Sequence, residues 1–205
     1  MRVGILGGTF DPVHLGHLII AEESRVQLRL DQVIFTPAGQ PWLKSRQPVS
    51  RAHHRLRMVE LAVASNPFFK VLSSEIDRAG PTYTVDTLAE LQKALGPDAR
   101  LYFIVGMDVV EQFHRWKEPE KLLELCNLVV VSRPGHQSVD ISRLVGQYPQ
   151  AGERLILLMV PRIEISSTEI RRRVSEGISI RYLVPELVEE YILEHQLYQH
   201  NNGLD

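Results

Sequence analysis

The chain of 205 residues contains a single cysteine, Cys126, so no intramolecular disulfide can form. No apolar run approaches the roughly 20 residues that span a bilayer, and the stretch Met1–Leu6 is too short for a signal peptide. The formal net charge is only -2, which argues against a general nucleic-acid or anionic-membrane binder. We therefore expect a cytoplasmic protein that has neither nucleic acid nor a membrane as its partner.

Acidic residues are absent between Asp31 and Glu60. The same stretch carries five basic side chains and two histidines, namely Lys44, Arg46, Arg51, Arg55, Arg57, His53 and His54. A second basic cluster runs from Arg171 to Arg173. Such clusters are either solvated surface or a positive field around a small anion, and the sequence leaves both interpretations open.

Short apolar runs alternate with longer amphipathic segments along the chain. The runs are Val3–Leu6, Gln32–Thr36, Phe69–Leu72, Leu101–Val105, Leu128–Val131 and Leu155–Val160. The amphipathic segments are Leu15–Leu30, Arg51–Ala64, Thr84–Leu95 and Ser138–Tyr148, followed by Ser167–Ser175 and Pro185–Gln196. Continuous apolar runs are typical of strands buried on both faces. The alternation predicts an α/β fold with a doubly wound, mostly parallel sheet.

We expect one domain over residues 1–205, with a core of about 1–165 and a C-terminal helical segment of about 166–197. In the last of these helices, Leu187, Val188, Tyr191 and Ile192 share one face and are expected to pack on the core. The polar tail from Tyr198 is expected to fray. Cys126 precedes an apolar run, which predicts a buried thiol. The oligomeric state stays open.

The segment from Gly7 to His17 joins the first expected strand to the first long helix, where a fold of this kind binds phosphate. Gly7 and Gly8 permit close backbone approach, and the helix start offers free N–H groups to an anion. The dinucleotide spacing G-x-G-x-x-G is absent, which argues against an NAD-dependent dehydrogenase. We expect a phosphate site at this corner.

His14 and His17 are three residues apart and can project from one side of the helix start. Imidazoles there can donate hydrogen bonds to phosphate and stabilise charge in a transition state. The alternatives are a zinc pair, which lacks both an obvious third ligand and an H-E-x-x-H motif, and a structural cap. Asp11 before Pro12 is expected to bond backbone N–H groups in a turn, with metal or substrate contact as the alternative.

A second helix start follows the last expected strand. Ser166 and Glu169 fit a capping box. The hydroxyls of Ser166, Ser167 and Thr168, together with Arg171, would form a second anion cradle. A plain capped surface helix is the alternative. Both cradles follow strands of one parallel sheet, so we expect them to lie at the same edge and to bind one polyphosphate together.

At these residues the chain resembles the nucleotidyltransferase α/β phosphodiesterase superfamily. The matching motifs are Gly8–Pro12, His14–His17 and Ile165–Arg171. Within that superfamily, the chain is most similar to the bacterial nicotinate-nucleotide adenylyltransferases, from the N-terminus to about Leu197. Further matches are Gly80–Leu88, Gly106–Asp108, Trp116 and Ser132–Gly135. Two positions depart from the family pattern: Leu43 replaces a usual histidine, and Met107 replaces a smaller residue.

The resemblance implies roles for individual residues. It implies that His14, His17, Lys44 and Arg171 are catalytic. It implies an ATP-binding set made of Gly7, Gly8, Thr9, Phe10, His17, Gly106, Asp108, Arg133, Ser166, Ser167, Thr168 and Arg171. It implies an acceptor-binding set made of Thr82, Tyr83, Thr84 and Trp116. The residues themselves leave alternatives: Thr82 and Thr84 as helix caps, Trp116 as core, and Asp108 as a helix N-cap.

The resemblance also implies the reaction, in which the adenylyl group of ATP joins nicotinate mononucleotide and pyrophosphate leaves. Mg²⁺ would arrive with ATP, since the motifs supply few carboxylates and no protein-built metal site is expected. Nicotinamide mononucleotide and phosphopantetheine are the alternative acceptors. A non-catalytic nucleotide sensor is the alternative from another class. A tRNA-synthetase fragment is disfavoured, because no second domain or basic surface is present to hold RNA.

Overall fold

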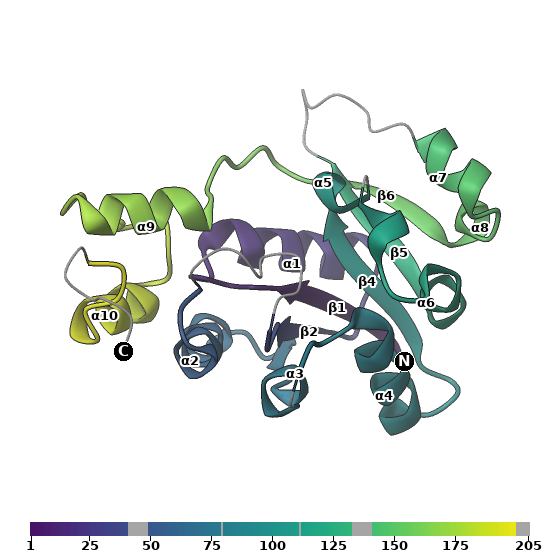
Figure 1. Ribbon diagram of the computed structural model, residues 1–205, viewed down its shortest axis with the longest axis horizontal. Coiled ribbons are helices and arrows are strands. Elements are labelled where there is room, and N and C mark those ends of the chain that lie inside the picture. The colour runs from purple at the N-terminus through teal and green to yellow at the C-terminus, as the bar shows by residue number, and fades with distance from the viewer. Residues whose placement is uncertain (41–48, 79, 111, 133–140, 200–205) are drawn as a thin grey trace.

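The computed structural model describes residues 1–40, 49–78, 80–110, 112–132 and 141–199. A six-stranded sheet forms its centre, with strand order β3-β2-β1-β4-β5-β6 and every pairing parallel (Figure 1). The strands are β1 (Arg2–Gly8), β2 (Gln32–Pro37), β3 (Phe69–Val71), β4 (Arg100–Gly106), β5 (Cys126–Ser132) and β6 (Leu155–Met159). All six expected strands are present, which confirms the doubly wound parallel fold.

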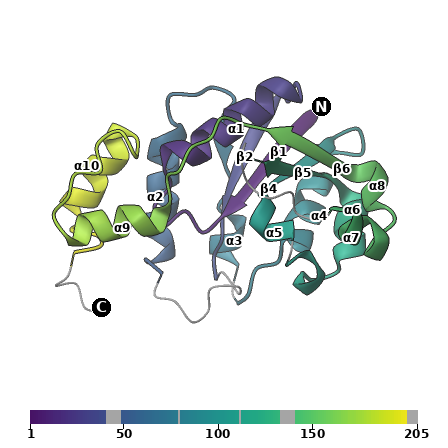
Figure 2. The same ribbon diagram turned by 90° about the horizontal axis from the view of Figure 1, so that it is seen from above.

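Helices connect the strands and cover both faces of the sheet (Figures 1 and 2). The described helices are α1 (Leu15–Gln27), α2 (Ala52–Val63), α3 (Ser74–Asp77), α4 (Thr84–Leu95), α5 (Met107–Val110), the 3-10 turn η2 (Phe113–Arg115), α6 (Pro119–Leu125), α7 (Ile141–Gln147), α8 (Ala151–Arg154), α9 (Ser167–Ser175) and α10 (Glu186–Glu194). None of them is long and apolar enough to cross a membrane.

Successive residues of the central strands pack into two different cores. Along β4, Leu101 and Phe103 join the core under α4 and α6, whereas Tyr102 and Ile104 join the core under α1 and α2. Side chains of a strand alternate between faces, so a strand covered on both sides must be apolar at every position. This burial explains why the strands are readable as continuous apolar runs.

The direction of strand addition reverses between β1 and β4. From β1 the sheet grows through β2 to β3 on one side, and from β4 through β5 to β6 on the other. The pairing of Leu6 with Ile104 aligns the two strands near their carboxyl ends. Ligands of doubly wound sheets bind beyond the carboxyl ends at such a switch point, which here lies beyond Gly8 and Gly106.

The C-terminal helices α9 and α10 lie together at one end of the molecule, beside α2 (Figures 1 and 2). Val188 and Ile192 are fully buried in the core next to α2, as predicted. Leu187 is 49% exposed, so the prediction that it faces the core is wrong. The prediction that the tail frays is wrong for Tyr198, whose hydroxyl donates a 2.7 Å hydrogen bond to Asp11. Residues 200–205 of that tail lie outside the described part of the chain.

Short helices are the main element class that the sequence does not predict. The four-residue helices α3, α5 and α8, and the seven-residue α6, complete too few turns to show a helical period. Pro119 occupies the first turn of α6, where its missing N–H has no intrahelical partner in any case. Cys126 is buried as expected, and burial raises the pKa of its thiol to about 12.

Candidate functional site

In the turn after β1, aromatic rings pack closely against the backbone of the same segment. Phe10 has a positive φ of 50°, which is strained for a residue with a side chain, and its ring is buried against Phe35 and His17. A Cβ on Gly8 would lie 3.0 Å from that ring, and one on Gly16 would lie 3.0 Å from Nδ1 of His14. Glycine at both positions therefore lets the rings pack under the corner.

The two histidines of the helix start stack on one another. Their ring centroids are 3.7 Å apart, which confirms that both project from one side. His14 is 5% exposed, whereas His17 is half-buried. The backbone N–H of His14 donates to Nδ1 of His17 at 3.2 Å. His17 thus has a capping role at the start of α1, which agrees with the alternative that the histidine pair forms a structural cap.

This bond also determines how His17 can act. A neutral imidazole has one N–H and one acceptor nitrogen. Because Nδ1 accepts the bond from His14, the proton of the neutral ring lies on Nε2, and the ring can donate only from that atom. Capping and hydrogen-bond donation to a ligand are therefore compatible in the same side chain.

The two predicted cradles are in direct contact. The hydroxyl of Ser167 donates to the carbonyl of Pro12 at 2.9 Å, and Nη1 of Arg171 donates to the carbonyl of Asp11 at 2.7 Å. Residues more than 150 positions apart in the sequence thus meet at the carboxyl edge of the sheet. The prediction that the two segments share one edge is confirmed.

Of the other side chains at the start of α9, one caps the helix and others form ion pairs on the surface. Oγ of Ser166 accepts from the N–H of Glu169 at 3.2 Å, so Ser166 is the N-cap residue. Thr168 is exposed. Arg172 and Arg173 pair with Glu169 along the solvent face. Of this basic cluster, only Arg171 turns toward the first cradle, and the other two arginines fit the interpretation as solvated surface.

The carboxylate of Asp11 is bonded from distant parts of the chain. Oδ1 accepts the hydroxyl of Tyr198 at 2.7 Å, and Oδ2 accepts the N–H of Ser50 at 3.3 Å. The expectation that Asp11 bonds backbone N–H groups within its own turn is wrong, because its N–H partner, Ser50, lies 39 residues away. Among the residues that the structure describes, no group of three metal-binding side chains exists.

Arg55 is a site residue that sequence reasoning missed. It is 1% exposed, and its guanidinium donates to four backbone carbonyls, those of Thr9, Ala38, Gly39 and Ser50. It is therefore neither a solvated arginine nor a side chain that faces a ligand. One signal was available: Arg55, Met58, Val59 and Ala62 have the spacing of one helix face, which places a charge on the buried side of α2.

A buried carboxyl group lies close to the residues that are predicted to bind the acceptor substrate. Glu75 is 8% exposed and accepts the hydroxyl of Thr87 at 2.8 Å. Burial raises the pKa of Glu75, although the hydrogen bond from Thr87 opposes the rise. Thr82 is 5% exposed, and its buried hydroxyl has no hydrogen-bond partner among the described residues.

The first turn of α4 carries the other predicted acceptor residues. The N-cap residue is Tyr83, without a side-chain cap bond, and α4 begins at Thr84. The alternative that Thr82 or Thr84 caps this helix is therefore wrong. Lys117 lies 4.8 Å over the ring of Tyr83 and 3.0 Å from Asp86, so the surface beside Thr84 combines an aromatic ring with an ion pair.

Trp116 packs at the border of the second core. Its ring lies edge-on to Phe103 at 5.6 Å and is stacked on Phe113 at 6.0 Å. The residue is half-buried, so the interpretation of Trp116 as ordinary core holds only for part of the ring. Its Nε1 is buried, and no partner for this N–H exists within the described part of the chain.

Three predicted site residues cannot be placed by their side chains. Gly106 ends β4, and Asp108 is the second residue of α5, so both follow the switch point, but the Asp108 side chain lies outside the described part. Lys44 and Arg133 lie wholly outside the described residues. Gly7 and Thr9 bracket Gly8 in the corner, with the carbonyl of Thr9 held by Arg55.

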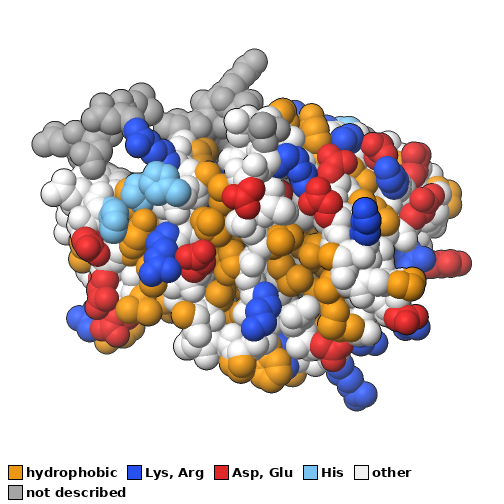
Figure 3. All heavy atoms as spheres, turned by 90° about the horizontal axis from the view of Figure 1, so that it is seen from below, with side chains coloured by type: hydrophobic (Ala, Val, Ile, Leu, Met, Phe, Trp, Pro, Cys, Tyr) orange, Lys and Arg blue, Asp and Glu red, His pale blue; other side chains and the backbone are white. Residues whose placement is uncertain are grey.

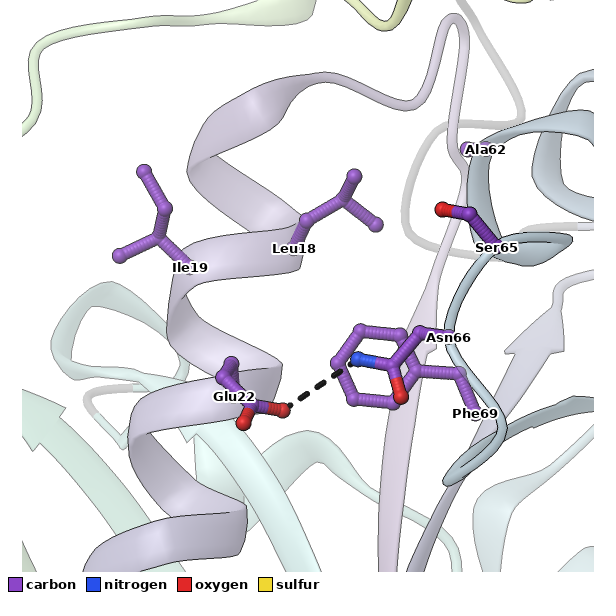
Figure 4. Close-up of a pocket in the computed structure, with 7 residues that line it drawn as sticks. All are labelled: Leu18, Ile19, Glu22, Ala62, Ser65, Asn66 and Phe69. Atoms are coloured by element: carbon purple, nitrogen blue, oxygen red, sulfur yellow. Dashed lines mark hydrogen bonds between the residues drawn. The ribbon is translucent and has the colours of Figure 1, made fainter.

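Two other surface features lie apart from this corner. A hollow of about 260 Å³ lies between α1 and the end of α2 and is lined by Leu18, Ile19, Glu22, Ala62, Ser65, Asn66 and Phe69 (Figure 4). It opens near the start of β3, not at the carboxyl edge. Histidine side chains gather over the end formed by α2 and α10 (Figure 3), where His54 bonds Tyr191.

The corner can hold a polyphosphate without supplying a nucleophile. Helix starts and a histidine pair face the carboxyl edge, with Arg171 bridging the cradles. The described residues there include no nucleophile paired with a base, an arrangement that covalent catalysis requires. The chemistry available is the positioning and charge stabilisation of groups that the substrates bring.

Comparison with known proteins places the chain among nucleotidyltransferases. A family model described as cytidylyltransferase-like matches residues 5–173. A probable nicotinate-nucleotide adenylyltransferase of Roseiflexus sp. is 50% identical over 197 residues, covering 96% of this chain and 98% of the relative. A protein of the same name from Dehalococcoides mccartyi is 46% identical over 198 residues, or 97% of each chain.

A solved structure shares the fold along nearly the whole chain. It is the Plasmodium falciparum nicotinic acid mononucleotide adenylyltransferase complexed with NaAD, which superimposes with a TM-score of 0.75 at 25% identity. The superposition covers 96% of this chain and 97% of the other. The similarity therefore includes both cradles and the C-terminal helices.

Proposed function

We propose that this chain, which belongs to the cytidylyltransferase-like family, transfers the adenylyl group of ATP to nicotinate mononucleotide and releases pyrophosphate. The observation that carries the proposal is the direct bonding of the two cradles through Ser167 and Arg171 at the switch point. The name of the relatives and the NaAD of the Plasmodium structure support the acceptor. We propose that the reaction takes place in the cytoplasm.

Each predicted residue has a place in this proposal. His14, His17, Lys44 and Arg171 supply positive or hydrogen-bonding groups to the ATP phosphates. Gly7, Gly8, Thr9 and Phe10 contribute backbone, since the Phe10 ring is buried. Ser167 and Thr168 contribute the N–H groups of the α9 start, with Ser166 as the cap. Gly106, Asp108 and Arg133 serve the nucleoside, and Thr82, Tyr83, Thr84 and Trp116 form the acceptor side, with Thr84 and Trp116 beside the pyridine ring. All of these belong to one domain.

The reaction needs no protein nucleophile. A 5′-phosphate oxygen of the mononucleotide attacks the α-phosphorus of ATP, the bond to the bridging oxygen breaks, and pyrophosphate leaves with its electron pair. The attacking oxygen is already an anion, so no general base is required. The protein must bring two anions together and stabilise the charge that develops on the departing oxygens. Nε2–H of His17 and the α9 start are suited to that charge.

We propose that Mg²⁺ enters with ATP. The described residues offer no protein-built metal site, and the carboxylate of Asp11 is occupied by Tyr198 and Ser50. Mg²⁺ usually keeps several waters and binds through substrate phosphates, which fits this donor set. When bound, it would neutralise triphosphate charge while His17 and Arg171 orient the same oxygens.

The test is a pyrophosphate-release assay with MgATP and three acceptors offered separately: nicotinate mononucleotide, nicotinamide mononucleotide and phosphopantetheine. We expect turnover with the acid, and kcat/KM for the amide lower by at least about tenfold. A preference for the amide or for pantetheine would retain adenylyl transfer and refute the acceptor. ATP binding without turnover on any acceptor would refute the enzyme and favour a nucleotide sensor.

A further inference from the structure

A buried cation lies directly beneath the phosphate corner. Arg55 projects from the first turn of α2 and is 1% exposed, the largest side chain in the molecule's described part that is fully buried. Side chains of this kind are almost never fully buried without a partner. Arg55 has no carboxylate among its direct hydrogen-bond partners in that part, and all four of its recorded hydrogen bonds go to backbone carbonyls.

Those carbonyls come from three separate segments. Nη1 donates to Thr9 at 2.8 Å, in the turn after β1, and to Ala38 at 2.7 Å, just beyond β2. Nη2 donates to Gly39 at 3.0 Å, and Nε donates to Ser50 at 3.0 Å. Ser50 in turn donates its N–H to Asp11. One guanidinium therefore ties the phosphate turn to the exit of the neighbouring strand and to the start of α2.

We propose that Arg55 is a positioning residue, which holds the turn from Thr9 to His14 in the geometry that receives the ATP phosphates. This proposal rests on the proposed function. The turn contains Phe10 in a strained conformation and leads directly into the His14–His17 pair. Strained backbone persists only where its surroundings impose it, and Arg55 supplies such a constraint at the carbonyl immediately before Phe10.

The geometry requires arginine in particular. A guanidinium is planar and has five N–H donors in a fixed fork, so one group can reach carbonyls on several segments at once. A lysine ammonium is a compact point charge with three donors and no fork. Burial lowers the pKa of Arg55 while Asp11 raises it, so the nearby carboxylate helps to keep the guanidinium charged under the corner.

The experiment compares Arg55→Lys and Arg55→Gln with a matched control, Arg57→Lys. Arg57 is two residues along the same helix, about half exposed, and pairs only with Glu60 among recorded partners. Each variant is assayed at 25 °C for kcat and KM, with the folded fraction measured by circular dichroism. A displacement of about 1 Å at a reactive site can lower a rate about 10²-fold, so we expect kcat per folded molecule to fall about 10- to 100-fold.

The KM for the mononucleotide should change less than about threefold in the Arg55 variants, because the acceptor side does not contact this residue. The Arg57 variant should match the wild type. Arg55 variants whose kcat per folded molecule stays within twofold of the wild type would overturn the proposal. A fall in kcat accompanied by an equal rise in the KM for the mononucleotide would also overturn the proposal, because it would indicate a general loss of structure.

A measurement on the wild-type chain covers the case in which both variants fail to fold, and it does not depend on turnover. The probe is inorganic pyrophosphate with Mg²⁺, added to protein labelled with ¹⁵N in arginine and histidine side chains. We expect the Nε signal of Arg55 to shift together with the ring nitrogens of His17, while the Arg57 signal stays in place. A shift of His17 without any response at Arg55 would overturn the proposal.

Discussion

At the scale of single residues, His17 combines two tasks on the two nitrogens of one ring. Nδ1 accepts the N–H of His14 and so caps α1. The neutral ring then carries its proton on Nε2, which is the atom able to donate to an anion. The backbone N–H at the helix start thus fixes the orientation of the ring and favours the tautomer that carries its proton on Nε2.

Replacing His17 by alanine should lower turnover far more than it weakens ATP binding. Loss of one donor to a developing charge typically lowers kcat by about 10²–10³-fold, whereas the helix start and Arg171 still hold ground-state phosphates. The measurement is kcat alongside the Kd of ATP from calorimetry. Equal losses in both would contradict a transition-state role.

Two further variants separate donation from capping. His17→Asn keeps an oxygen that can accept the His14 N–H, so it should restore stability but not kcat. His53→Ala removes an exposed imidazole on α2 and should leave both quantities unchanged. Recovery of kcat in the asparagine variant would show that His17 acts through the cap alone.

Glu75 gives a second residue-scale prediction, on stability. Burial raises the pKa of its carboxyl above the ordinary 4.5, so the folded chain keeps this proton to a higher pH than the unfolded chain does. The folded state therefore loses stability as the pH rises from about 4.5 through the folded pKa. Glu75→Gln removes the ionisation and retains an acceptor for Thr87.

The melting temperature of Glu75→Gln should rise relative to that of the wild type as the pH increases from 4.5 to 8. A difference of 1 kcal/mol corresponds to about 2–4 °C in a chain of this size. The control is Glu153→Gln on the exposed surface of α8, which should show no such trend. A melting-temperature difference for Glu75→Gln that does not vary with pH would contradict a perturbed carboxyl group.

At the scale of elements, the turn before α1 is held by segments that the chain reaches much later. Tyr198 lies just beyond α10 and bonds the Asp11 carboxylate, and the carbonyl of Leu183 accepts the N–H of Leu15 at 3.0 Å. The start of α9 adds the bonds from Ser167 and Arg171. The C-terminal helices thus form one side of the phosphate corner.

Tyr198→Phe should destabilise the chain and weaken the attachment of the C-terminal segment to the first turn. A hydrogen bond to a charged group contributes about 1.5–3 kcal/mol, so the melting temperature should fall by about 3–12 °C. Hydrogen exchange should speed up at Asp11 and at residues 196–198. Tyr182→Phe is the matched control, because Tyr182 is 79% exposed. Unchanged stability in Tyr198→Phe would show that this bond does not hold the segment.

At the scale of the whole molecule, the site is formed by segments from both ends of the chain, which come together at the switch point of the sheet. Residues near position 10 contact residues near 170 and near 198. Parallel sheets bring the carboxyl ends of all strands to one edge. The family likeness extends over nearly the full length, which fits a site that needs both ends.

Much of this arrangement was predictable from the sequence because its signals are local. A strand covered on both faces must be apolar throughout, so β1, β4 and β5 stand out as continuous runs. Glycines, a histidine pair and a Ser166–Glu169 cap mark the two helix starts. Four short helices of the described part, α3, α5, α6 and α8, escaped prediction, because one or two turns are too few to show a helical period.

What the sequence alone determined is therefore the order of strands and helices, the two cradles, and the resemblance that they carry. Only the tertiary structure decided which polar groups serve the fold instead of a ligand. The sequence left Arg55 open between solvated surface and a field around an anion, and the structure buries it against backbone carbonyls. Thr82 was expected to contact a ligand, and its hydroxyl is buried. Tyr198 was expected to fray, and its hydroxyl bonds Asp11. The physical reason is that the partner of a buried polar group is set by the packing of distant segments, and no local pattern encodes it.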